Sequence, residues 1–405
     1  MITIPGRFLE VHVVQPIPFA NLNRDDTNAI KTVKWGGVER TRVSSQCWKR
    51  AMRLHLQQNL GQDALRTRRL PELIGKHLKD NHHWPTELAE RAGRHIAVAS
   101  SVGAEAPKKK EKKDKEENVE PNGVSDAWTT AAMVYIPATA VAELAELAIE
   151  HREALEQAKD PAKFERKHAV VPTDKIDAIL RRRNGIINLF GRMLAQVDDA
   201  KVDGAVQVAH CFTTHATDTE IDYFSAVDDV TSGWGDTTGS AHMGHAEHSA
   251  GVFYRNIVVD LQDLHRNLGG SLADTRELAA GVIRAALLSL PHAKKNSTAP
   301  NTVPALAHVT VRADRPVSYA AAFEKPVAAD YSGGGHSDPS VEALSAYATA
   351  VNGLLGTSGL LHHAHATLSP ADTSGLGQRV VSFDELIVGA LDCALDGVMP
   401  LKEKV

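Results

Sequence analysis

The stretch RTRVSSQCWKRAMR, residues 40–53, decides how this chain is interpreted. Ser44 and Ser45 are typical of a helix start, because a serine side chain accepts hydrogen bonds from free backbone N–H groups. The helix is predicted to run to about Leu60. Its apolar side, which should face a core, consists of Cys47, Trp48, Ala51 and Met52. Its opposite side consists of Gln46, Lys49, Arg50 and Arg53.

This helix is a candidate phosphate-binding element. Lys49 and Arg53 are four residues apart and should lie one above the other on its surface. The N–H groups at the start, near Ser44 and Ser45, add a partial positive charge. Together these groups form a row suited to phosphate, although an amphipathic helix with a hydrated basic side explains the spacing as well.

Charge is unevenly distributed along the chain. The whole sequence has 45 Lys and Arg against 50 Asp and Glu, a net charge of −5, which excludes a uniformly basic nucleic-acid coat. Residues 1–70 carry twelve Lys or Arg and five Asp or Glu, hence a local net charge of +7. This asymmetry indicates an anionic partner for the N-terminal region, with a hydrated basic surface as the alternative.

Membrane and disulfide-rich classes are excluded on composition. No run of about eighteen apolar residues exists, and no apolar signal-peptide segment forms before Arg7 and Glu10. Cys47, Cys211 and Cys393 are too far apart to suggest a disulfide scaffold or a thiolate zinc site. We therefore expect a cytoplasmic protein with no membrane partner.

Hydrophobic patterning predicts an α+β sheet core. Strands are expected at 8–15, 205–214, 251–261 and 304–313. Helices are expected at 140–158, 174–195, 272–290, 339–353 and 383–396. Pro16 and Pro18 should end the first strand, and the polar residues 21–37 should form a long loop. Residues 60–185 should be a separate helical unit, with a flexible charged loop at 105–120.

Two sets of polar residues allow a metal as an alternative. In the loop at 21–26, Arg24 could contact phosphate or sugar, while Asp25 and Asp26 could bind a metal or cap a turn. Two histidine groups could hold zinc, but glycines mark the first as a loop and nothing fixes the rings together. The groups are His242, His245 and His248, and His362, His363 and His365.

A catalytic alternative rests on acids between the strands at 205–214 and 251–261. Two metal ions held by carboxylates would make a metal-dependent ribonuclease, and the same acids could equally keep a hairpin soluble. The acids are Asp218, Glu220, Asp222, Asp228 and Asp229. His336, after three glycines at 333–335, is the candidate catalytic histidine of an RNA-processing subunit.

Nine short motifs occur in an order that matches a known family. They are LNRDD (22–26), WGG (35–37), RTRVSSQCWKRAMR (40–53), GRM (191–193), KVDGAVQVAH (201–210), IDYFSAVDD (221–229), GSAHMG (239–244), SAGVFYR (249–255) and NLGG (267–270). In this order they resemble the backbone subunit of type I-E Cascade, the CRISPR-associated CasC family. The resemblance is densest over 7–60 and 186–290. It implies a non-catalytic, RNA-binding subunit of an antiviral complex that needs no metal and no cofactor.

The resemblance also implies a fold like a right hand. The palm, a modified RNA-recognition-motif (ferredoxin-like) sheet, would comprise 1–59, 186–216 and 251–405. The helical fingers would be 60–185, and the thumb would be a long β-hairpin at 217–250. About six copies would stack head to tail along one CRISPR RNA, together with other Cascade subunits. Each thumb would kink the guide and displace one nucleotide, while target DNA pairs with the guide.

Individual residues are assigned on the matching motifs. The resemblance implies guide-RNA contacts for Arg24, Asp26, Lys31, Ser44, Gln46, Lys49 and Arg53. It implies that Met193 wedges beside the bases, and that Ser225 and Met243 fold over the displaced nucleotide. The chain departs from the family in a shorter step from Met193 to Lys201 and in its charged loop at 105–120.

Overall fold

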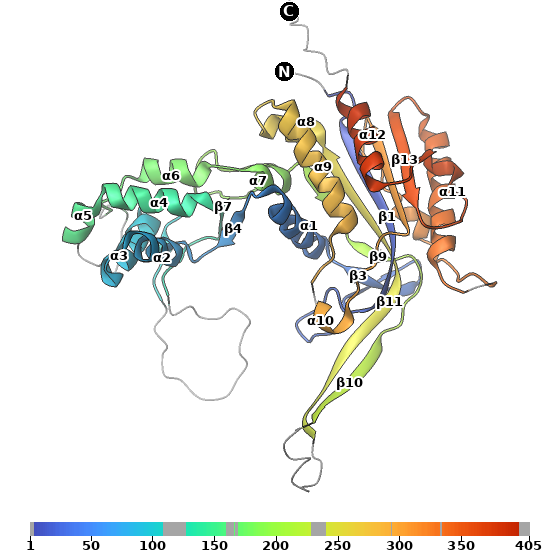
Figure 1. The fold of residues 1–405 in the computed structure, drawn as a ribbon, viewed down its shortest axis with the longest axis horizontal. Helices are drawn as coiled ribbons and strands as arrows, with labels where there is room; N and C mark the ends of the chain where they lie inside the picture. The colour runs from blue at the N-terminus through green and yellow to red at the C-terminus, as the bar shows by residue number, and fades with distance from the viewer. Residues whose placement is uncertain are drawn as a thin grey trace, which may run out of the picture. The chain divides into compact units, whose positions relative to one another are not determined.

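The computed structural model describes residues 4–107, 127–158, 166, 169–227, 240–292, 294–332 and 334–396. For residues 226–227 and 240–243 the description covers the backbone alone. The chain divides into two compact units (Figure 1). The first unit joins Met1–Asn59 with Ala205–Val405, and the second is Leu60–Gly204. Each unit is described by itself.

One mixed sheet organises the first unit (Figure 1). Its order is β14-β13-β12-β1-β11-β9-β3-β2, and β8 and β10 also pair with β11. The pairs are antiparallel except for β13 and β14, which are parallel. The strands are β1 (Phe8–Ala20), β2 (Thr32–Trp35), β3 (Val38–Val43), β8 (Val206–Val208), β9 (Cys211–Thr213), β10 (Glu220–Val227), β11 (Ser240–Asp260), β12 (Leu306–Arg312), β13 (Leu360–Thr367) and β14 (Gln378–Arg379).

The strands predicted at 8–15 and 251–261 lie side by side in this sheet, as parts of β1 and β11. The strand predicted at 205–214 is also beside β11, but it is divided into β8 and β9. The division falls at residues 209–210, where the His210 Nδ1 accepts the N–H of Ser45 at 3.1 Å. A single long strand was therefore wrong, although its place in the sheet was right.

Pro16 and Pro18 do not end the first strand, because β1 continues to Ala20. On one side β12 pairs with β1 only as far as Val14, so the rest of that side is a sheet edge. The Thr302 hydroxyl donates to the Pro16 carbonyl at 2.7 Å, so the backbone of Pro16 faces this edge. Proline has no backbone N–H, and at this edge its absence costs no hydrogen bond between strands.

The polar segment 21–37 is not one long loop. Its second half forms β2, which pairs with β3 as an antiparallel hairpin. Gly36 and Gly37 make the two-residue turn with φ values of 61° and 81°, a conformation that favours glycine at both positions. The charged residues of β2 and β3 made this hairpin resemble a polar loop in the sequence.

Helices cover both faces of the sheet. Trp48 of α1 packs in a cluster with Phe253 of β11, whereas Tyr254 packs with Leu344 of α11. Because adjacent strand residues point to opposite faces, α1 and α11 lie on opposite sides of β11. The helices are α1 (Ser45–Leu60), α8 (Leu261–Asn267), α9 (Leu272–Leu288), α10 (Lys295–Thr298), η3 (Ala320–Phe323), α11 (Ser337–Leu355), η4 (Ser374–Leu376) and α12 (Phe383–Leu395). Three of them, α9, α11 and α12, confirm the helices predicted at 272–290, 339–353 and 383–396.

The second unit is mainly helical, as its sequence predicts. Its elements are β4 (Ala64–Thr67), α2 (Leu70–His82), α3 (Thr86–Ala99), β5 (Ala104–Glu105), β6 (Thr129–Thr130), β7 (Val134–Pro137), α4 (Thr139–Glu150), α5 (Arg152–Gln157), α6 (Thr173–Arg181) and α7 (Gly185–Phe190). The helices predicted at 140–158 and 174–195 are each divided into two shorter ones. Most of the charged loop predicted at 105–120 lies outside the described residues.

Residues 186–204 belong to this second unit, which moves the predicted boundary at 185. The reason is Arg192, which is only 4% exposed. Its guanidinium donates to the carbonyl oxygens of Leu180 at 3.0 Å, Arg182 at 2.7 Å and Ala200 at 2.7 Å. These bonds tie the segment after α7 to the end of α6. Over the described parts of both units, no helix is long and apolar enough to span a bilayer.

Candidate nucleic-acid interface

Ser44 caps α1, as the sequence predicts. Its Oγ accepts the N–H of Cys47 at 3.3 Å, and its carbonyl accepts the N–H of Trp48 at 3.1 Å. The N–H of Ser45 is held by His210, a residue to which no local pattern in the sequence assigned a role. The start of α1, with the positive end of its dipole, is therefore fixed in place.

The two sides of α1 separate as the periodicity predicts. Its buried residues are Trp48, Ala51, Met52 and Leu56. On the polar side, Gln46 and Arg50 are exposed, whereas Lys49 and Arg53 are half-buried. Lys49 and Arg53 are one helical turn apart, so their charges lie along one line of the helix surface. This side of α1 can contact consecutive phosphates.

The loop between β1 and β2 carries three further predicted contacts. Arg24 and Asp26 are exposed, and Lys31 is half-buried. Asp25 caps the turn between them, because its Oδ1 accepts the hydroxyl of Thr27 at 2.8 Å and the N–H of Thr27 at 2.9 Å. The hydroxyl bond is the main cause that lowers the pKa of Asp25. The turn-capping alternative accounts for this aspartate.

Hydrogen bonds fasten this loop to α1 and to the base of the β10–β11 hairpin. Asn23 Oδ1 accepts the N–H of Ser44 at 2.8 Å. Asn21 Nδ2 donates to the Glu247 carbonyl at 3.0 Å, and the N–H of Ile30 donates to Glu247 Oε2 at 2.8 Å. Loop, helix start and hairpin base therefore form one connected surface of the first unit.

The predicted hairpin contacts lie on β10 and β11, which extend beyond the rest of the sheet in Figure 1. Ser225 is exposed and stands opposite Met243 in the strand register; the Met243 side chain is outside the described atoms. Tyr223, which sequence reasoning missed, is 77% exposed, with its ring centroid 6.3 Å from that of His245. Strand alternation places Tyr223 on the face of Ser225, a signal that the sequence contained. Residues 228–239, with two of the candidate metal-binding acids, lie outside the described residues.

Met193 belongs to the second unit, where 86% of its surface is exposed. Its neighbour Leu194 is buried, so exposure is a property of this side chain and not of the whole segment. An exposed methionine suits contact with a partner. The other predicted contacts all belong to the first unit.

Arg40, which contributed to the basic character of the N-terminal region, has a structural role instead. It is fully buried, and its guanidinium donates to the carbonyl oxygens of Thr213 at 3.0 Å and Phe323 at 2.8 Å. Burial lowers the pKa of Arg40. This charge ties β3 to η3 and does not reach the surface.

The histidines and acids form no metal site within the part of the chain that the structure describes: no group of three or more His, Cys, Asp or Glu is placed to hold an ion. Burial lowers the pKa values of His362, His363 and His365 on β13. His336, the candidate catalytic histidine, stacks on His215 with ring centroids 3.8 Å apart. These contacts give His336 a packing role at the base of the hairpin.

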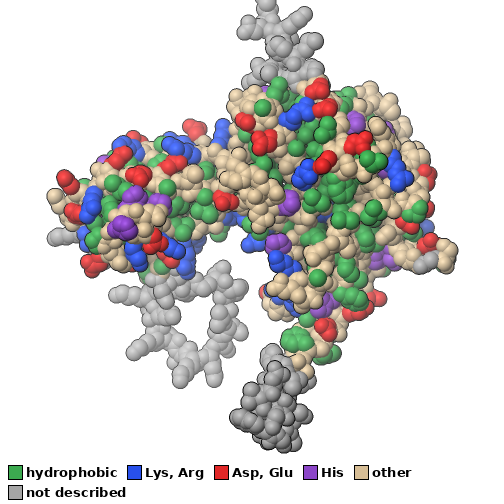
Figure 2. All heavy atoms as spheres, viewed as in Figure 1, with side chains coloured by type: hydrophobic (Ala, Val, Ile, Leu, Met, Phe, Trp, Pro, Cys, Tyr) green, Lys and Arg blue, Asp and Glu red, His purple; other side chains and the backbone are tan. Residues whose placement is uncertain are grey.

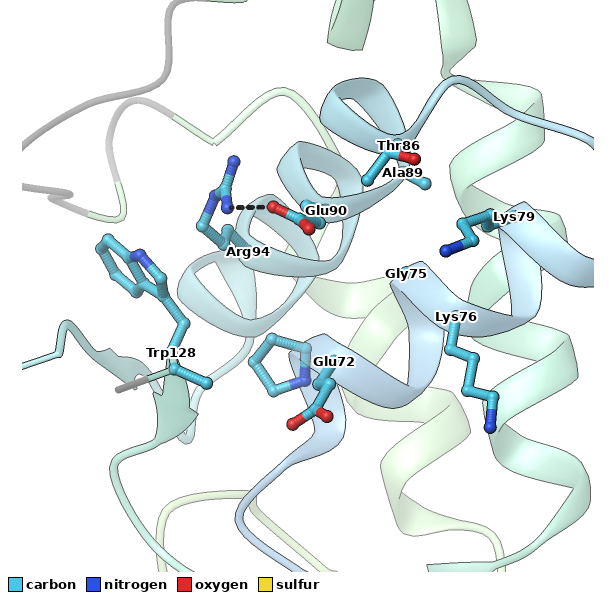
Figure 3. Close-up of a pocket in the computed structure, with 11 residues that line it drawn as sticks. Glu72, Gly75, Lys76, Lys79, Thr86, Ala89, Glu90, Arg94 and Trp128 are labelled. Atoms are coloured by element: carbon cyan, nitrogen blue, oxygen red, sulfur yellow. Dashed lines mark hydrogen bonds and ion pairs between the residues drawn. The ribbon is translucent and has the colours of Figure 1, made fainter. Parts of the chain in front are cut away.

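A cavity of about 420 Å³ lies between α2 and α3 of the second unit (Figure 3). Lys76 and Lys79 line it together with Glu72, Glu90 and Arg94. Arg94 Nη1 donates to Glu90 Oε2 at 3.4 Å, so these two charges partly neutralise each other. Because acids and bases share the lining, this cavity favours a polyanion less than the α1 surface does.

Fold and surface together define a mixed α+β protein that presents a capped, basic helix beside an exposed β-hairpin. The chain belongs to the family described as CT1975-like protein, which it matches over residues 9–388. It is similar to a chain of a solved structure titled "CRISPR RNA-guided surveillance complex, pre-nicking", with 38% identity, 96% of this chain and 100% of that chain covered, and a TM-score of 0.81. A second, titled "CRISPR RNA-guided surveillance complex", has 34% identity, the same coverage and a TM-score of 0.73. The comparison with curated proteins gave no match.

Proposed function

We propose that this chain is the CRISPR RNA-binding backbone subunit of a type I-E Cascade surveillance complex. The observation that carries the proposal is the α1 surface, where Lys49, Arg53 and the helix start capped by Ser44 lie together. This surface occurs in a chain that is 38% identical, over 96% of its length, to part of an RNA-guided surveillance complex.

The chemistry of α1 suits a guide whose sequence varies. Lysine and arginine side chains bind phosphate and sugar without reading base edges, and the positive end of the helix dipole adds to their attraction for phosphate. A guide held in this way keeps its bases available for pairing with target DNA, which then supplies the sequence specificity. Arg24, Asp26, Lys31 and Gln46 would add contacts around the same strand.

In this proposal the sheet unit is the palm, the helical unit the fingers and the β10–β11 hairpin the thumb. The exposed hairpin supports a role in kinking the guide, with Ser225 and Met243 over one displaced nucleotide and Met193 as a wedge. About six copies would stack head to tail, and other Cascade subunits would join them. A thumb that acts on the neighbouring copy makes a head-to-tail interface, and such interfaces build an open filament when they do not close into a ring. The complex would act in antiviral defence in the cytoplasm.

The subunit is proposed to bind RNA without catalysing a reaction. Labelled RNA should therefore stay intact when incubated with the protein in Mg²⁺ or Mn²⁺. Cleavage that disappears in the Asp222→Ala variant would contradict this part of the proposal and favour the metal-dependent ribonuclease.

Binding itself is tested with Lys49→Ala combined with Arg53→Ala. The double variant should bind single-stranded RNAs of unrelated sequence more weakly, and its salt dependence should become shallower by about 0.7 per lost phosphate contact. The control, Lys76→Ala with Lys79→Ala, removes the same charge from the second unit. Loss confined to particular RNA sequences, or an equal loss in the control, would contradict backbone recognition by α1.

A further inference from the structure

A groove runs along one side of α1, between this helix and residues 289–303. It consists of two cavities of about 290 Å³ and about 360 Å³. The cavities adjoin, because Ala51 and Leu54 of α1 and Pro291 and His292 of the facing segment line both of them. Sequence reasoning gave no role to this facing segment.

The groove combines positive charge with apolar walls. Arg24 and Arg50 line one cavity, Lys295 lines the other, and His292 lines both. No aspartate or glutamate is among the described residues that line either cavity. Leucine, proline and valine side chains share the remaining wall with polar ones, among them His55, Gln58 and Asn301. Figure 2 shows Lys, Arg and His side chains gathered over the region of α1 and α10.

The segment that closes the groove is held in a costly conformation. Lys294 and Ala299, on either side of α10, have φ values of 50° and 41°, which residues other than glycine rarely adopt. Further along, Gln15 Nε2 donates to the Thr302 carbonyl at 2.6 Å, and the Thr302 hydroxyl donates to the Pro16 carbonyl at 2.7 Å. Strain of this kind persists only where the surrounding structure imposes it, and it is concentrated at ligand-binding sites.

We propose that this groove binds one phosphate-bearing nucleotide. Its phosphate would lie against Arg24, Arg50 and His292, which line one cavity. Its base would lie in the adjoining cavity, against leucine and proline side chains and beside Lys295. A carboxylate-free lining admits the phosphate without repulsion. The groove adjoins the predicted contact side of α1, because Arg50 borders both. The inference rests on the proposed RNA-binding function where the nucleotide belongs to the guide; a free nucleotide has the same chemistry.

The groove is tested with Arg50→Ala combined with Lys295→Ala in the full-length chain. The probe is a labelled oligouridylate that carries photoreactive 4-thiouridine. The double variant should bind it about tenfold more weakly per lost charged contact, with a salt dependence shallower by about 0.7 for each. In the unaltered protein the photoreactive base should cross-link to residues 289–303, and the variant should lose this cross-link.

A parallel titration with uridine monophosphate identifies the source of the nucleotide. If the unaltered protein binds uridine monophosphate and the groove variant does not, the site takes free nucleotides as well as RNA. Loss of oligouridylate affinity alone assigns it to the RNA strand. Both results support the groove as a nucleotide site.

The outcome that overturns the groove is also distinct from failure of the proposed function. The groove proposal is wrong if the groove variant meets three conditions. It would bind oligouridylate as tightly as the Lys76→Ala, Lys79→Ala control, give the same cross-links as the unaltered protein, and bind uridine monophosphate as the unaltered protein does. If the Lys49→Ala, Arg53→Ala variant binds oligouridylate weakly in the same experiment, the proposed RNA-binding function of the α1 surface is still supported. If none of the variants changes RNA binding, both proposals fail.

Discussion

Lowering the pH from 7 to 4 should weaken the base of the β10–β11 hairpin through His215. This side chain is 6% exposed and stacks on His336. Its Nε2 accepts the N–H of Val252 in β11 at 3.0 Å, so its Nδ1 carries the proton and donates to the Ala216 carbonyl at 2.8 Å. Protonation of Nε2 would remove the acceptor for Val252 and place a charge in the interior.

The expected magnitude follows from the pKa of His215. Burial is the main cause that lowers it from 6.5 to about 4, with smaller contributions from His336 and Arg40. The unfolded chain therefore takes up this proton near pH 6.5, and the folded chain only near pH 4. The stability that the neutral ring contributes is complete above about pH 6.5 and is lost as the pH falls to about 4. The difference between the pKa values of His215 in the unfolded and folded chain corresponds to about 3 kcal/mol of unfolding free energy.

The assay compares urea unfolding of the unaltered protein and of His215→Gln across this pH range. Glutamine keeps a neutral acceptor for the Val252 N–H but does not titrate. Between pH 7 and pH 4 the unfolding free energy of the unaltered protein should fall by about 3 kcal/mol relative to that of His215→Gln, since all other titrating groups are shared. Parallel pH curves for the unaltered protein and His215→Gln would refute the reasoning.

Three further predictions concern stability. Trp48 is 2% exposed and packs with Phe253, so Trp48→Ala should lower the unfolding free energy by about 3–5 kcal/mol in urea titration, and Trp48→Phe by less. A Cβ at Gly93 would stand 2.1 Å from the carbonyl oxygen of Pro71, so Gly93→Ala should lower the unfolding free energy of the second unit by about 1–3 kcal/mol, measured by thermal unfolding. Arg192→Met should cost about 3 kcal/mol or more, because several buried carbonyl groups lose their donor, and limited proteolysis should then cleave within 186–204. Resistance of that segment equal to that of the unaltered protein would contradict the role given to Arg192.

The sequence by itself determined the local features of this protein. The Ser44 cap and the two sides of α1 follow from residues within one or two turns of each other, and a local periodicity does not depend on the rest of the chain. The same holds for α12, where Ser382 Oγ accepts the N–H of Glu385 at 3.1 Å, a cap formed by residues three positions apart. The nine ordered motifs identified the relationship to the surveillance complexes, which the comparisons confirm.

Tertiary structure alone decided which charges are available and which segments meet. Arg40 and Arg50 are ten positions apart in one basic stretch, yet the first is buried against carbonyl groups of η3 and the second lines a groove. Pro16 remains in a strand because its neighbour on one side ends early. His210 reaches the start of α1 from the break between β8 and β9, far along the chain. Each of these outcomes depends on strand register and on contacts between residues more than a hundred positions apart, and no local pattern in the sequence specifies such contacts.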